Sequence, residues 1–106
     1  MSRRVLHPFP WQEPWDALPE SLQVPYQAQL KHEVGHGHPL FGYSYTPVGK
    51  HAGTDDVLVA LEGGQLAVVH LTWGGLGDKY HPRTTFFASW DDFAVQRMDE
   101  DALDYF

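Results

Sequence analysis

Hydrophobic side chains recur every four residues in two segments, the spacing that places them on one face of an α-helix. In the first segment the stripe consists of Tyr26, Leu30 and Val34. Pro25 suits the first turn of a helix, and Gly35 suits the left-handed position that follows the last turn. The pattern therefore predicts a helix from Pro25 to about Gly35 whose stripe faces the core.

A second stripe lies near the C-terminal end, in the order Trp90, Ala94, Met98, Ala102 and Phe106. Ser89, a good N-cap residue, stands before it, and the acids at positions 91 and 92 suit the positive end of the helix dipole. These features predict a C-terminal helix with one buried face.

Between the two helices the pattern changes to that of strands, which are predicted at 42–51, 57–61, 65–73 and 84–88. The second and third are apolar on both faces near their connection, so we expect them to be central and covered on both sides. The predicted class is α+β: a small antiparallel sheet of about four strands with an N-terminal and a C-terminal helix.

The connection between the two central strands is predicted to be a two-residue hairpin turn at Gly63 and Gly64. Counting outward from that turn fixes the pairing of all later residues. It places Asp55, His70 and Thr72 on the same face, where they would form a polar corner at the end of the hairpin.

Residues 1–24 are predicted to form an extended arm that precedes a single domain at 25–106. Residues 7–25 contain five prolines and three large aromatic residues without helical or strand periodicity. Two interpretations of Trp11 and Trp15 stay open, because these side chains could pack over an open face of the core or be exposed to a partner.

The net charge of the chain indicates which classes of macromolecule it could bind. The chain has 106 residues, with fourteen acids against seven Lys and Arg, for a net charge of −7. The cations are scattered along the sequence, so repulsion from phosphate argues against direct binding of nucleic acid. A basic protein partner is expected instead, and the oligomeric state is left open.

The chain contains no cysteine, which excludes disulfides, a thiol nucleophile and cysteine-based zinc sites. No apolar run approaches the roughly 20 residues of a membrane span, and the first fifteen residues lack the apolar core of a signal peptide. A soluble cytoplasmic protein without membrane partners is therefore expected.

Positions 32–36 read H-E-x-x-H, the spacing by which zinc peptidases place two histidines on one helical face with a glutamate beside them. On the predicted helix, however, His32 lies about 200° around from Leu30 and points to solvent. Glycines also end the helix before His36. A metal site is therefore not predicted, although flexible His32, His36 and His38 could bind a divalent metal adventitiously.

The predicted corner of Asp55, His70 and Thr72 has two interpretations. A carboxylate that orients an imidazole is an acid-base arrangement, but the register brings no serine or cysteine nucleophile beside it. The favoured interpretation is a buried histidine paired with a carboxylate at the sheet edge, and a bound ligand there is left open.

The segment GGLGDKYHPR at 74–83 is predicted to be a flexible loop. It resembles a phosphate-binding loop only loosely, because the lysine-hydroxyl ending and the following helix are missing. Phosphate binding is not predicted from it.

Three short segments, HPLFG at 38–42, DDVL at 55–58 and VHLTW at 69–73, resemble a family of small uncharacterised bacterial proteins. The resemblance covers about the middle third of the chain, and VHLTW is its most specific part. It implies a small cytoplasmic α+β domain and supplies no reaction or cofactor. The family pattern begins at His38 and does not require the preceding H-E-x-x-H.

These features favour a non-enzymatic, acidic protein-binding module without a cofactor, of the kind found among immunity proteins that neutralise basic toxins. The expected binding residues are those of the polar corner and the acids Asp99, Glu100 and Asp101, which gather at the negative end of the C-terminal helix dipole. The alternative is a zinc-dependent hydrolase built on the H-E-x-x-H at 32–36.

Overall fold

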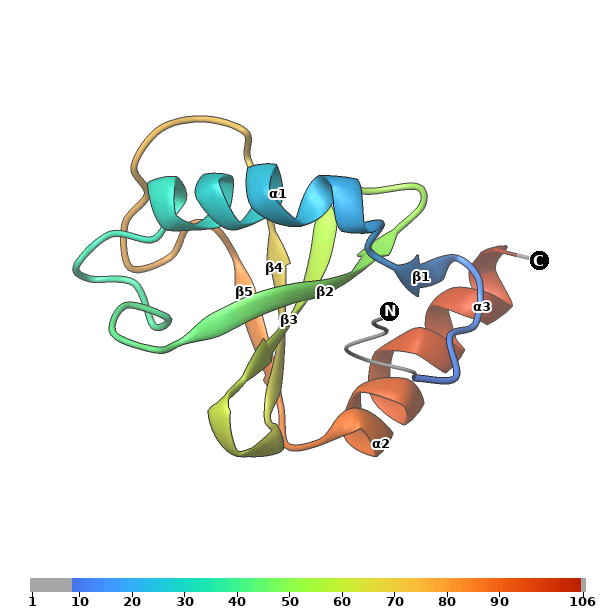
Figure 1. Cartoon of the computed structure of the whole chain (residues 1–106). Helices are drawn as coiled ribbons and strands as arrows, with labels where there is room; N and C mark the ends of the chain where they lie inside the picture. The colour runs from blue at the N-terminus through green and yellow to red at the C-terminus, as the bar shows by residue number, and fades with distance from the viewer. Residues whose placement is uncertain (1–8, 106) are drawn as a thin grey trace.

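A five-stranded antiparallel sheet carries a helix on one face and a helical segment on the other (Figure 1). The structure, a computed structural model, describes residues 9–105. The strands follow one another across the sheet in chain order: β1 (Trp15–Ala17), β2 (Tyr45–His51), β3 (Asp56–Leu61), β4 (Leu66–His70) and β5 (Thr84–Phe87). The predicted α+β class is confirmed, with one strand more than expected.

Helix α1 (Glu20–Glu33) begins ahead of the predicted start at Pro25, which lies inside the helix. Tertiary contacts explain the longer helix, because the first turn is tied to the sheet. Leu22 packs against the core, and Gln23 Nε2 donates to the carbonyl of Pro47 at 2.8 Å. The predicted stripe is confirmed as the buried face, since all of its members are buried: Tyr26, Leu30 and Val34.

The two faces of the sheet carry separate apolar clusters, which explains why the central strands are apolar on both sides. The cluster under α1 includes Leu30, Val57, Val59, Val69 and Leu71. The cluster under the C-terminal helical segment includes Trp15, Leu58, Val68, Phe93 and Met98. The site described below opens on the second face.

The N-terminal arm is only partly extended. Residues 15–17 form the edge strand β1, where Trp15 pairs with His51, and the predicted boundary between 24 and 25 falls inside α1. Trp15 is fully buried and meets the ring of Phe93 edge-on at 5.1 Å, so its indole belongs to the core. The part of the predicted arm at 1–8 lies outside the described residues.

The C-terminal segment consists of α2 (Trp90–Phe93), a π-helical turn η2 (Ala94–Met98) and α3 (Asp99–Tyr105). The predicted N-cap is confirmed, because the side chain of Ser89 accepts from the amide of Asp92. Sequence periodicity missed Phe93, which is fully buried. The predicted stripe is confirmed over the described residues, because Met98 and Ala102 are buried and Trp90 and Ala94 pack against the apolar cluster of this face. Phe106 lies outside the described residues.

The turn between β3 and β4 contains three residues, η1 (Glu62–Gly64), where two were predicted. Gly63 and Gly64 have φ of +83° and +89°, and the amide of Leu61 donates to the carbonyl of Gln65. With Glu62 inside the turn, the pairing shifts by one residue. The predicted register is therefore wrong, and His70 lies opposite Asp56.

We expect Gly49→Ala to destabilise the fold by about 1 to 3 kcal/mol, because overpacking a filled core forces its neighbours to move. A Cβ at Gly49 would collide with the ring of Trp11. Gly53→Ala is the matched control in the following loop, where the added Cβ would meet only His51 at an ordinary 3.5 Å. Urea unfolding of both variants measures the difference, and equal stabilities would contradict the packing of Trp11 on β2.

Candidate functional site

The glutamate of the H-E-x-x-H segment is a buried structural acceptor at the C-terminal end of α1. Glu33 is fully buried, and its Oε1 accepts from the amide and the hydroxyl of Thr72 at 2.9 and 2.8 Å. Its Oε2 accepts from the amide of Trp73 at 2.9 Å and from Nε2 of Gln29 at 2.7 Å. Trp73 has a φ of +59°, which is rare for a bulky residue. The carboxylate thus holds a strained turn after β4.

The two histidines of the same segment do not meet around that carboxylate. Helix α1 ends at Glu33, so His36 lies beyond it, exposed and stacked on the ring of Phe41 at 4.5 Å. His32 is exposed on the helix. Over residues 9–105 no group of three His, Asp or Glu side chains is placed to hold a metal ion. The geometry gives the zinc-hydrolase alternative no support.

His38, the third histidine of this region, is buried. Its Nδ1 accepts from the amide of Leu40 at 3.0 Å, which leaves Nε2–H to donate to the carbonyl of Pro82 at 2.7 Å. This bond connects the loop after α1 to the start of β5. His32 and His36 are thus exposed and His38 is buried, and the structure does not bring the three side chains together around one position.

The predicted polar corner is divided between the two faces of the sheet. Asp55 accepts from Trp73 Nε1 at 3.1 Å, and Thr72 binds Glu33, both on the side of α1. His70 lies on the opposite face, with Nδ1 at 2.9 Å from Asp56 Oδ1. The predicted contact between Asp55 and His70 is wrong. A shift of one residue in the register of two paired strands moves a side chain to the other face of the sheet.

Asp56 is the centre of a polar network that sequence reasoning missed. Besides His70, its carboxylate accepts from Thr54 Oγ1 and from Arg97 Nη2, each at 2.8 Å. Burial alone would raise the pKa of Asp56, but the hydrogen bonds from His70, Thr54 and Arg97 outweigh it and lower that pKa below its ordinary value. Asp55 and Asp56 are consecutive in the sequence. The three-residue turn between β3 and β4 sets the register that makes Asp56 the partner of His70.

Arg97 extends this network to the N-terminal edge strand. Its Nε donates to Asp101 Oδ2 at 2.8 Å, and the same oxygen accepts from Trp15 Nε1 at 2.8 Å. Asp101 is therefore an internal acceptor and not a free surface charge. The other two acids predicted to bind a partner, Asp99 and Glu100, are exposed.

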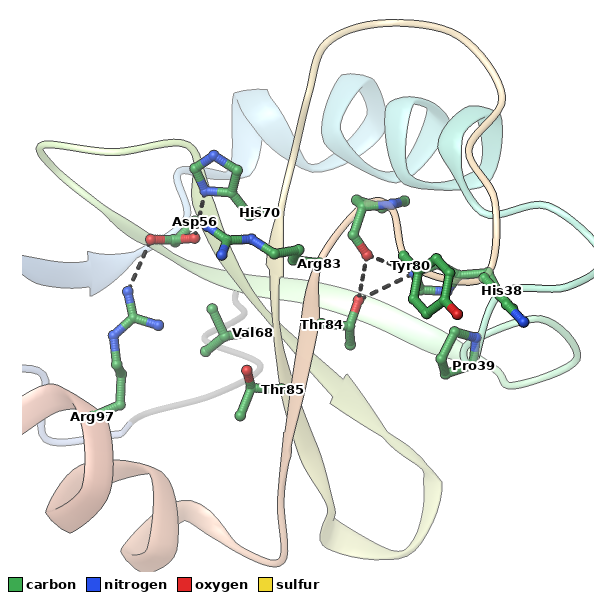
Figure 2. Close-up of a pocket in the computed structure, with 12 residues that line it drawn as sticks. His38, Pro39, Asp56, Val68, His70, Tyr80, Arg83, Thr84, Thr85 and Arg97 are labelled. Atoms are coloured by element: carbon green, nitrogen blue, oxygen red, sulfur yellow. Dashed lines mark hydrogen bonds and ion pairs between the residues drawn. The ribbon is translucent and has the colours of Figure 1, made fainter.

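A cavity of about 550 Å³ opens beside the Asp56 network and continues around the start of β5 (Figure 2). Its lining comprises His38, Pro39, Asp56, Val68, His70, Lys79, Tyr80, Pro82, Arg83, Thr84, Thr85 and Arg97. The segments HPLFG, DDVL and VHLTW each contribute to it, through His38 and Pro39, Asp56, and His70 respectively. The loop at 74–83 supplies Lys79, Tyr80, Pro82 and Arg83. Segments far apart in the chain thus meet at one concave surface.

Comparisons of the chain with protein-family models, curated proteins and solved structures found no match. The resemblance to a bacterial family stays a prediction.

Glu33→Gln is expected to destabilise the protein by about 1 to 3 kcal/mol, because an amide nitrogen would replace a buried oxygen that accepts two hydrogen bonds. His32→Ala and His36→Ala are the controls, and both should stay within about 0.5 kcal/mol of wild type because their side chains are exposed. Urea unfolding with and without added zinc measures all three. Wild-type stability of Glu33→Gln would show that the carboxylate does not hold the turn.

Asp56 should make the protein sensitive to acid. Because its pKa is lower in the folded chain than in the unfolded one, its contribution is complete above the unfolded pKa and is lost as pH falls through the folded pKa. We expect Asp56→Asn to be less stable by about 1 to 3 kcal/mol at pH 7. The gap should narrow below about pH 4. Unfolding curves at several pH values test this, and a gap independent of pH would contradict it.

Proposed function

We propose that this chain is a non-enzymatic binding module that holds a basic protein against the outer face of its C-terminal helical segment. The observation that carries the proposal is a pair of exposed aliphatic side chains among acids. Val95 and Leu103 are 66% and 79% exposed, and Asp99 lies midway between them in the sequence, also exposed. Apolar anchors surrounded by charge are typical of protein interfaces.

The charges near this pair favour a basic partner. Asp91, Glu100 and Asp104 are exposed on the same helical segment, whose Arg97 is already bound to Asp56 and Asp101. Acids near the C-terminal end of a helix cost about 0.3 to 1 kcal/mol each, so helix stability does not account for them. A complementary positive surface would remove that cost and speed association.

Two buried carboxylates favour a binding role over a catalytic one. The carboxylates of Glu33 and Asp56 each accept several hydrogen bonds from the protein itself. The concrete form proposed is an immunity-like protein that neutralises a basic toxin domain, by analogy of class. Asp55 and Thr72 take part in the contacts that hold the turn after β4, so the proposed surface no longer includes them.

Within residues 9–105 no helix is long and apolar enough to cross a membrane. The cytoplasmic location predicted from the sequence forms part of this proposal.

The interface is tested with a variant that carries Val95→Ser, Asp99→Asn, Glu100→Gln and Leu103→Ser. Asp101 is left unchanged because Trp15 and Arg97 depend on it. Glu20→Gln with Glu62→Gln is a control that removes two exposed acids elsewhere. Each form is immobilised and exposed to an extract of the source cell. A basic protein that wild type and control retain and the variant loses is expected.

Binding of that protein is then followed at several salt concentrations. The association rate of wild type should fall as salt rises, and the dependence should be weaker in the variant. Equal retention by the variant, or an association rate without salt dependence, would refute the proposed surface. Circular dichroism confirms that the variant is folded.

A further inference from the structure

We propose that the cavity beside the Asp56 network binds a small organic anion whose phosphate or carboxylate head lies between Arg83 and Arg97. This site is separate from the proposed protein-binding face. It has its own determinants, and anion binding there requires no protein partner.

Positive charge gathers at this cavity in a chain that is otherwise acidic. The chain has seven Lys and Arg and a net charge of −7, yet Lys79, Arg83 and Arg97 all line the cavity. Asp56 is the only carboxylate in the lining, and Asp101 outside the lining also binds Arg97, so Lys79 and Arg83 are the cations of the cavity that no carboxylate there offsets. A concave surface of one sign concentrates ligands of the opposite sign.

Arg83 is the clearest candidate for contact with the anion. Its guanidinium has no hydrogen-bond or ion-pair partner among residues 9–105, whereas Arg97 has two. Its main-chain carbonyl accepts from the amide of His70 at 2.9 Å, which fixes the base of the side chain at the cavity. In Figure 2 the side chain points toward His70 and Asp56. A planar guanidinium suits bidentate contact with an oxyanion.

Hydrogen-bond requirements also distinguish Arg83 from its neighbours. Asp56 already receives three hydrogen bonds, including those from His70 and Arg97, and this fixes the Arg97 guanidinium at the cavity wall before any ligand arrives. A cation held in advance loses little side-chain entropy on binding. Arg97 therefore forms a preorganised wall, and Arg83 supplies the unsatisfied donors.

The opposite end of the cavity is suited to an organic group. Pro39 and Tyr80 line it, and the Lys79 ammonium lies over the Tyr80 ring at 5.0 Å from its centre. Figure 2 shows both Pro39 and Tyr80 on the other side of β5 from Arg97. The volume of about 550 Å³ is in the range of small-molecule sites and far exceeds the ~30 Å³ share of one water. An anion with an apolar or aromatic body fits these features better than a bare ion.

This mode of binding differs from that of a phosphate loop. The segment at 74–83 lacks the signature in which main-chain amides surround the phosphate. Here the same segment contributes side chains, Lys79 and Arg83, to a surface completed by β3, β4 and η2. The sequence therefore contains no phosphate-loop signature, although it contains the cationic side chains that line the cavity.

The test uses isothermal titration of the full chain with phenyl phosphate, benzoate and inorganic phosphate. Arg83→Gln is the informative variant, because no described residue depends on its guanidinium. Lys31→Gln removes the same charge from an exposed position of α1 and is the matched control. Thermal unfolding without ligand verifies that both variants are as stable as wild type.

Saturable binding of phenyl phosphate or benzoate is expected, about tenfold tighter than inorganic phosphate, because only the organic anions reach the Tyr80 end. Tighter binding of phenyl phosphate assigns a phosphate head, and tighter binding of benzoate assigns a carboxylate head. Arg83→Gln should weaken binding about tenfold, while Lys31→Gln should leave it within twofold. The proposal is overturned if neither organic anion binds saturably, or if the two variants weaken binding equally.

Discussion

The Arg97 guanidinium connects the last helix to the middle of the sheet and, through Asp101, to the N-terminal edge strand. One of its nitrogens donates to Asp56 on β3, and another donates to Asp101 on the last helix, whose carboxylate also accepts from Trp15 on β1. Because Arg97 and Asp101 are one helical turn apart, this arrangement fixes both the position of the helix and its rotation. These contacts therefore determine which face of the C-terminal helical segment is exposed, and they place Arg97 in the wall of the cavity.

Glu33 has the corresponding role on the other side of the sheet. Four donors from α1 and from the turn after β4 converge on its carboxylate, and they include the amide of Trp73, whose backbone is in the left-handed region. The spacing of the glutamate and the two histidines at 32–36 is typical of zinc peptidases. In the folded chain the carboxylate of this glutamate holds the turn after β4. Burial and the direction of the donors distinguish these roles, and neither can be obtained from residue spacing.

Sequence reasoning succeeded where a pattern repeats and failed where one residue decides. The stripe of α1, the N-cap at Ser89 and the α+β class depend on several residues each, so one error does not change the result. The register of the hairpin depends on whether Glu62 belongs to the turn, and that single choice moved the partner of His70 from Asp55 to Asp56. The cavity was not foreseen because its cations are scattered in the sequence and only the folded chain gathers them.

The contact between Trp15 and Asp101 spans 86 positions of the chain. During synthesis the ribosome releases β1 long before the helix that covers its tryptophan, so the indole stays without its final surroundings until Asp101 has also left the ribosome. Contacts of such long sequence separation also slow folding, because a large loop must close before they form. The sheet edge at β1 is therefore expected to be among the last parts of the molecule to reach its native packing.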